Sequence, residues 1–220
     1  MSAMSPRNAT YFKIRFLLLE YINEHISNFE VRKKSQSFVM KVLGSFLFFN
    51  KGFMTRYITT IYPKIYVPDW WGRYRKNNYL ELGILMHEYV HLMDRKRLGW
   101  FFNILYLSPQ IFALLALGAF WNLWFLLFLI FLLPWPSPGR AWIEMRGYRM
   151  TIAFFYWTKR KKYDINIVVN HFTGSDYYYM FPFKKYLKMW FNKEFDKIKN
   201  NELSPELVEA KKILERVRNV

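Results

Sequence analysis

Apolar residues recur at helical spacing near the start of this chain of 220 residues. In residues 11–29, apolar side chains at every third or fourth position alternate with polar and charged ones, which predicts an amphipathic helix. Residues 38–49 are also apolar, but Lys41 and Gly44 interrupt them, and they are too few for an ordinary membrane-spanning helix. We therefore expect residues 38–49 to be buried or to lie at a membrane surface.

The pattern changes in residues 54–71, which are rich in Tyr, Ile, Thr and Val and contain Pro63 and Pro68. This composition predicts two short strands that form a hairpin or ribbon. Helical spacing returns from about Asn78, and we expect one helix to run from there to Arg97.

Residues 99–136 contain no Lys, Arg, Asp or Glu. A membrane crossing needs about 20 residues, so this segment is long enough for one crossing and nearly long enough for two. Breaks at Ser108-Pro109 and at residues 118–122 predict a helical hairpin that either spans a membrane or dips into it. Basic residues flank both ends and stay cytosolic, so we expect the chain to return to the side from which it entered.

The remainder of the chain is more polar. Residues 140–157 have helical spacing, whereas residues 166–183 combine a β-like run with Gly-Ser-Asp turn chemistry. The last segment predicts two helices that divide at residues 200–201, the second with Ser204 as its N-cap and Pro205 as its first residue.

Composition narrows the possible partners. The formal net charge is +17, and basic flanks beside apolar segments indicate contact with anionic lipid headgroups. Apart from residues 159–162 the basic residues are dispersed, so we expect no specific nucleic-acid partner. The chain has no cysteine, so any metal must be bound by His and carboxylate groups. The apolar run near the N-terminus is too short for a cleaved signal peptide.

The candidate chemistry lies in the sequence His-Glu-x-x-His at residues 87–91. His87 and His91 are four residues apart, so on a helix both imidazoles project from one face and can bind the same metal ion. Two imidazoles suit zinc, and a catalytic zinc site keeps one position open for water. We expect Glu88 to be the general base that accepts a proton from this water and delivers it to the leaving amine.

A third ligand is required, and two residues are candidates. Asp94 follows His91 by three residues, but a straight helix carries it a further turn away from the metal. Glu144 lies beyond the apolar hairpin, on a second helix that can cross the first. We prefer Glu144, and Asp94 is then either an acceptor that orients a histidine N–H or a partner for neighbouring basic residues.

The order of a His-Glu-x-x-His motif, an apolar hairpin and a Glu in an Arg-flanked helix resembles membrane-embedded gluzincin metallopeptidases of the HtpX and prenyl-protein (CAAX) endopeptidase type. The resemblance covers residues 80–150. It implies that His87, His91 and Glu144 are the zinc ligands and that Glu88 is the general base. The compact, cysteine-free, aromatic-rich chain is also similar to zincin-like proteins of bacteriophages.

These patterns predict a mainly helical α+β fold. We expect a zincin-like core in which a short β-hairpin precedes the His-Glu-x-x-His helix and a hydrophobic helical hairpin is inserted. The expected segments are N-terminal amphipathic or interfacial helices (1–53), the β-hairpin and metal-binding helix (54–97), the membrane hairpin (98–136), and the second half of the core with the third-ligand helix and C-terminal helices (137–220).

A zincin also needs side chains that stabilise the oxyanion of the transition state. Tyr148 shares a helix face with Glu144, His171 lies in a polar loop, and Arg146 is a third candidate. The tyrosines at 177–179 are expected either to line a substrate groove or to lie at a membrane interface.

The expected function is that of a zinc-dependent endopeptidase acting on membrane-associated or unfolded proteins. We expect an integral or monotopic membrane protein whose active site lies on the cytoplasmic side. The alternative is a non-catalytic membrane-binding or virion structural protein with a zincin-like fold, in which zinc is absent or purely structural.

Overall fold

The computed structural model describes residues 6–48, 50–72, 79–158 and 163–218. It divides the chain into two compact units, Met1–Lys96 with Ser204–Val220, and Arg97–Leu203. Helices predominate among the described residues, which also contain one small mixed sheet. The prediction of a mainly helical α+β fold is therefore confirmed. The basic cluster at residues 159–162 lies outside the described residues.

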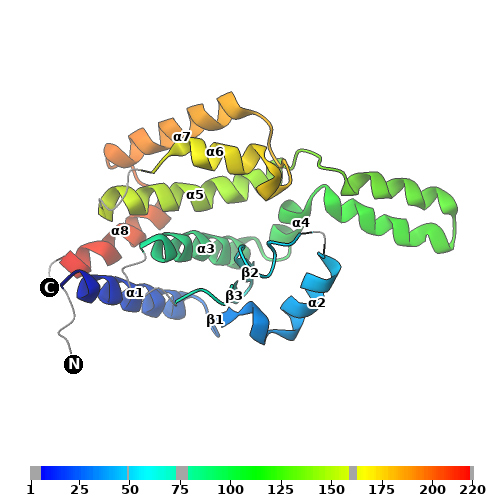
Figure 1. The fold of residues 1–220 in the computed structure, drawn as a ribbon. Coiled ribbons are helices and arrows are strands. Elements are labelled where there is room, and N and C mark those ends of the chain that lie inside the picture. The colour runs from blue at the N-terminus through cyan, green and yellow to red at the C-terminus, as the bar shows by residue number, and fades with distance from the viewer. Residues whose placement is uncertain (1–5, 49, 73–78, 159–162, 219–220) are drawn as a thin grey trace. The chain divides into compact units, whose positions relative to one another are not determined.

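The first unit combines helices with the sheet (Figure 1). Its strands follow the order β1-β3-β2, with β1 parallel and β2 antiparallel to β3. The sequence predicts β2 and β3 but not β1, whose charged residues give no alternating pattern. In chain order the elements are α1 (Pro6–His25), β1 (Glu30–Lys33), the 3₁₀-helix η1 (Lys34–Gln36), α2 (Phe38–Phe46), β2 (Thr59–Ile61), β3 (Lys64–Val67), α3 (Tyr79–Leu98, which ends in the second unit) and α8 (Pro205–Arg218).

Helix α1 connects α3 and α8 within the first unit. Leu18 and Ile22 of this helix, and Ile26 directly after its end, are buried at four-residue spacing, which is the apolar stripe that the sequence predicts. The hydroxyl of Tyr21 donates a hydrogen bond of 3.0 Å to Glu209 of α8. The Tyr21 ring also meets the ring of Tyr89 on α3 edge-on, with 5.5 Å between centroids. The three helices therefore share one core.

The second unit consists of helices, and α5, α6 and α7 run side by side in it (Figure 1). Phe172 of α6 packs edge-on against Phe191 of α7 at 5.8 Å, and Arg149 of α5 pairs with Glu194 of α7 at 3.3 Å. The elements are α4 (Phe101–Leu107), the 3₁₀-helices η2 (Gln110–Phe120) and η3 (Leu123–Leu132), α5 (Pro138–Thr158), α6 (Ile165–Thr173), the 3₁₀-helix η4 (Ser175–Tyr177) and α7 (Lys184–Lys199).

The β-like run expected from residue 166 onward is instead part of helix α6, so this prediction was wrong. Asp164 caps the helix, because its side chain accepts the backbone N–H of Asn166 at 2.9 Å. Val168 and Phe172 are both buried four residues apart. Burial against α5 and α7 favours the helix over the modest strand preference of the β-branched residues.

The apolar segment forms a hairpin with both of the predicted breaks. Helix α4 ends before Ser108-Pro109, η2 continues at a bend of 92°, and the chain reverses at Trp121-Asn122 into η3. Among the described residues no single helix has the length and apolarity of a membrane span, and the bent pair of α4 and η2 meets that standard only jointly.

Candidate functional site

Helix α3 holds the two motif histidines on one face in the first unit. His87 and His91 are 7% and 5% exposed, and their ring centroids are 4.7 Å apart with the rings nearly perpendicular. The four-residue spacing accounts for this proximity, since residues one turn apart are neighbours on a helix surface. Leu82 and Met86 are buried on the same helix and fix it in the core. The structure therefore confirms that the two imidazoles lie together.

The small sheet positions Glu88, the predicted general base. Thr60 of β2 donates a hydrogen bond of 2.6 Å from its hydroxyl to Oε2 of the half-buried Glu88. A hydrogen bond to a charged carboxylate is stronger than one between neutral groups. The β-hairpin that precedes α3 in the sequence thus has a definite role, because it orients the carboxylate between the two histidines in the motif.

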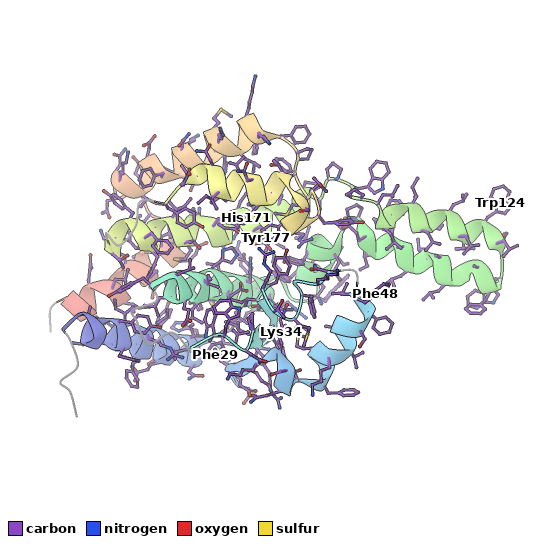
Figure 2. All side chains as sticks on the ribbon, viewed as in Figure 1. Phe29, Lys34, Phe48, Trp124, His171 and Tyr177 are labelled. Carbon is purple, nitrogen blue, oxygen red and sulfur yellow. The ribbon has the colours of Figure 1, made fainter. Side chains whose placement is uncertain are left out.

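The charge of Glu88 acts on a buried lysine. Lys34 is wholly buried, donates to the carbonyl of Phe53 at 2.5 Å, and lies 4.0 Å from the centroid of the Phe53 ring (Figure 2). Burial lowers the pKa of Lys34 to about 8, and the negative charge of Glu88 acts in the opposite direction. Sequence patterns do not identify this residue, since Lys34 stands in a run of polar and charged residues.

Glu144, the preferred third ligand, lies on α5 in the second unit and is 2% exposed. The hydroxyl of Tyr106 on α4 donates a hydrogen bond of 2.7 Å to its Oε1. A close approach of the two helices allows this contact, because a Cβ atom on Gly139 would lie 2.8 Å from the carbonyl oxygen of Leu105. The carboxylate is thus oriented by a phenol that sequence reasoning did not identify.

Arg140 joins Tyr106 to a second tyrosine. Its guanidinium lies 5.0 Å from the ring centroid of Tyr106 and 5.5 Å from that of Tyr177. Burial raises the pKa of Tyr177 well above its ordinary value, and the negative charge of Glu144 raises it further. Tyr177 therefore stays protonated and can donate a hydrogen bond.

The two predicted oxyanion donors, Tyr148 and His171, belong to the same cluster as Glu144. The Tyr148 hydroxyl lies 3.1 Å from the Tyr177 hydroxyl, and the Tyr148 ring stacks on His171 with 6.2 Å between centroids. Figure 2 shows His171 and Tyr177 next to each other. Arg140, Glu144 and Tyr148 follow one another at four-residue spacing on α5, and this spacing is the sequence signal that could have identified Arg140.

The remaining candidates are Arg146 and the two tyrosines that follow Tyr177. Arg146 places its guanidinium 5.2 Å from the ring centroid of the half-exposed Trp142. Tyr178 and Tyr179, which follow Tyr177, are exposed. Their role in a substrate groove stays a prediction, as does the role of Arg146.

His87 and His91 of the first unit and Glu144 of the second unit are each buried. Asp94 of the first unit is buried as well, at 2% exposed. Two imidazoles and one carboxylate are a donor set that catalytic zinc sites use.

No protein-family model matches the chain, and no curated protein or solved structure shows significant similarity to it.

Proposed function

We propose that the chain is a zinc-dependent endopeptidase associated with a membrane, with a zincin-like core and the ligand order of gluzincins. Its substrates are peptide bonds of membrane-associated or unfolded proteins at the cytoplasmic face. His87, His91 and Glu144 are the proposed ligands. Their donor set fits zinc, and the chain has no cysteine that could provide a competing thiolate site.

The observation that carries this proposal is the arrangement around Glu88. Two adjacent buried imidazoles alone would suit a structural metal site equally well. A carboxylate between them in the motif, half-buried and oriented by Thr60 at 2.6 Å, is a feature that a structural site does not require. General-base catalysis does require such a group, held in position and still accessible.

The proposed roles of the other residues follow from their contacts. A zinc ion supplies a Lewis acid and lowers the pKa of a bound water. Glu88 accepts the proton of the attacking water and returns it to the leaving amine. Tyr106 orients Glu144, and the hydroxyl of Tyr148, with His171 stacked on its ring, donates to the developing oxyanion.

The first experiment measures metal content by mass spectrometry on protein purified in detergent without chelators. Wild type and Asp94→Asn are expected to contain about one zinc per chain, whereas His87→Ala and Glu144→Gln are expected to lose it. If Glu144→Gln retains zinc and Asp94→Asn loses it, the third ligand is Asp94 and not Glu144. Absence of zinc from the wild type would overturn the proposal.

The second experiment tests catalysis with Glu88→Gln and an unfolded protein substrate such as casein. The variant is expected to keep its zinc and to lose cleavage, because the amide cannot accept the proton. Cleavage at the wild-type rate in Glu88→Gln would exclude Glu88 as the general base. A wild type that binds zinc but cleaves nothing would favour the non-catalytic alternative, in which the metal is structural.

A further inference from the structure

The hairpin of η2 and η3 presents apolar side chains in every direction. Its described helices contain no buried residue and no charged residue. The five consecutive residues Leu123–Leu127 are all exposed, and one turn of a 3₁₀-helix contains only three residues. The exposed surface therefore surrounds the helix and is not a single stripe. A protein partner covers one face, whereas lipid acyl chains can surround a helix completely.

The backbone at the tip of the hairpin meets the requirement that hydrocarbon imposes. Within a bilayer each polar backbone group needs an internal partner. The N–H groups of Trp121 and Asn122 donate to the carbonyl of Gly118 at 2.9 and 3.1 Å. The Asn122 side chain accepts the N–H of Trp124 at 3.0 Å. These N–H groups at the reversal of the chain thus have their hydrogen-bond partners within the hairpin.

The length of the two helices separates a spanning hairpin from a shallow one. Helix η2 has 11 residues and η3 has 10. At about 2 Å of rise per residue in a 3₁₀-helix, each is roughly 20–22 Å long, and α-helical geometry would shorten it to about 16 Å. The hydrocarbon core of a bilayer is about 30 Å thick. Each helix is long enough for one leaflet and too short for two.

A segment with exposed aromatic and basic residues begins at the base of the hairpin. The base is closed by hydrogen bonds from the Ser137 hydroxyl to the Ser108 carbonyl, and from the Ser137 N–H to the Met180 carbonyl at 2.7 Å. The Tyr178 hydroxyl donates to the Leu132 carbonyl, which places the start of segment 178–186 beside η3. This segment exposes aromatic rings and two lysines, namely Tyr178, Tyr179, Phe183, Lys184, Lys185 and Tyr186.

We propose that the η2–η3 hairpin inserts into one leaflet of an anionic bilayer and returns to the same side. Segment 178–186 then lies at the headgroups, where tyrosines are favoured and lysines attract anionic lipid. This inference deepens the membrane association in the proposed function, and its test does not depend on zinc or hydrolysis.

The absence of native cysteine allows a direct test of depth. Leu123→Cys places a single thiol at the tip of the hairpin, and Lys193→Cys places one on the exposed surface of α7 as a control. Both variants are bound to vesicles of phosphatidylcholine with about one-third phosphatidylglycerol. A membrane-impermeant maleimide is supplied either outside the vesicles or trapped within them.

For a hairpin in one leaflet, the thiol at position 123 reacts with neither the external nor the trapped reagent, and it reacts once detergent dissolves the vesicles. The control thiol at position 193 reacts with the external reagent throughout. Reaction of Leu123→Cys with the trapped reagent would show a spanning hairpin and overturn the one-leaflet depth alone. Reaction with the external reagent, or self-association without vesicle binding, would overturn membrane insertion itself.

The role of segment 178–186 is tested by sedimentation with the same vesicles. The double variant Lys184→Ala/Lys185→Ala is expected to bind about 30-fold more weakly, since each lysine near an anionic surface contributes about fivefold. The matched variant Lys193→Ala/Lys199→Ala is expected to bind as the wild type does. Equal loss in both variants would show that net charge, and not this segment, determines binding. Metal content and casein cleavage, measured in parallel, show separately whether the peptidase proposal holds.

Discussion

The hydrogen bond from Thr60 to Glu88 gives a quantitative prediction for catalysis. Replacing Thr60 by Val keeps the shape of the side chain and removes the hydroxyl that donates to Oε2 at 2.6 Å. A hydrogen bond to a charged group contributes about 1.5–3 kcal/mol. Glu88 is half-buried and water can replace part of that contact, so we take the lower half of this range. Each 1.4 kcal/mol corresponds to about tenfold in rate, so kcat is expected to fall by about ten- to fortyfold.

The assay compares casein cleavage by Thr60→Val and Thr59→Val at equal zinc content. Thr59 is the preceding residue of β2, and side chains of successive strand residues point to opposite faces. Thr59→Val therefore makes the same chemical change without removing the contact to Glu88, and it is expected to retain wild-type kcat. Both variants should bind zinc normally, because neither residue is a proposed ligand. Equal rates for the two variants would refute the reasoning that the sheet positions the general base.

Three further predictions concern stability and metal affinity. Burial lowers the pKa of Lys34 from 10.5 to about 8, so between these pH values the unfolded chain binds more protons than the folded one. The free energy of unfolding therefore rises with pH in this range, by up to about 3 kcal/mol. Urea unfolding should show this rise in the wild type and not in Lys34→Met. Tyr106→Phe removes the donor to Glu144 and should weaken zinc binding by about 10- to 100-fold in a chelator competition. Gly139→Ala places a Cβ atom 2.8 Å from the carbonyl oxygen of Leu105 and should lower the free energy of unfolding by about 1–3 kcal/mol, measured by denaturant titration.

The features that sequence predicted correctly depend on local periodicity or on local breaks. Helix α3 (Tyr79–Leu98), the strands β2 and β3, and the reversal at Trp121-Asn122 each have their signal within a few residues. Strand β1 has no such local signal, because it pairs in parallel with β3 and the partner of its residue Glu30 is Lys64, far along the chain. The β-branched residues at 167–169 gave a misleading local signal, which the packing of α6 overrides.

The same distinction applies to the candidate site. The four-residue spacing of His87 and His91 places both imidazoles on one face, and this geometry follows from the sequence alone. The partners that orient the functional groups come from other elements. Thr60 reaches Glu88 from β2, and Tyr106 reaches Glu144 from α4 across 38 residues. Such contacts are determined by tertiary packing, and a single sequence contains no pattern for them.

The base of the hairpin and the Glu144 cluster are parts of one packed structure, and this links the membrane to the proposed chemistry. Ser137 closes the base of the hairpin, and α5 begins at the next residue. Glu144 follows six residues into that helix, which is about 9 Å at 1.5 Å per residue. If the base lies at the headgroups, this carboxylate lies within about 9 Å of them. A spanning hairpin would return the chain to the same position. Under the proposed function, the depth of the hairpin therefore sets how firmly the protein is held at the membrane, and the length of α5 between Ser137 and Glu144 sets how close to the lipid the proposed cleavage takes place.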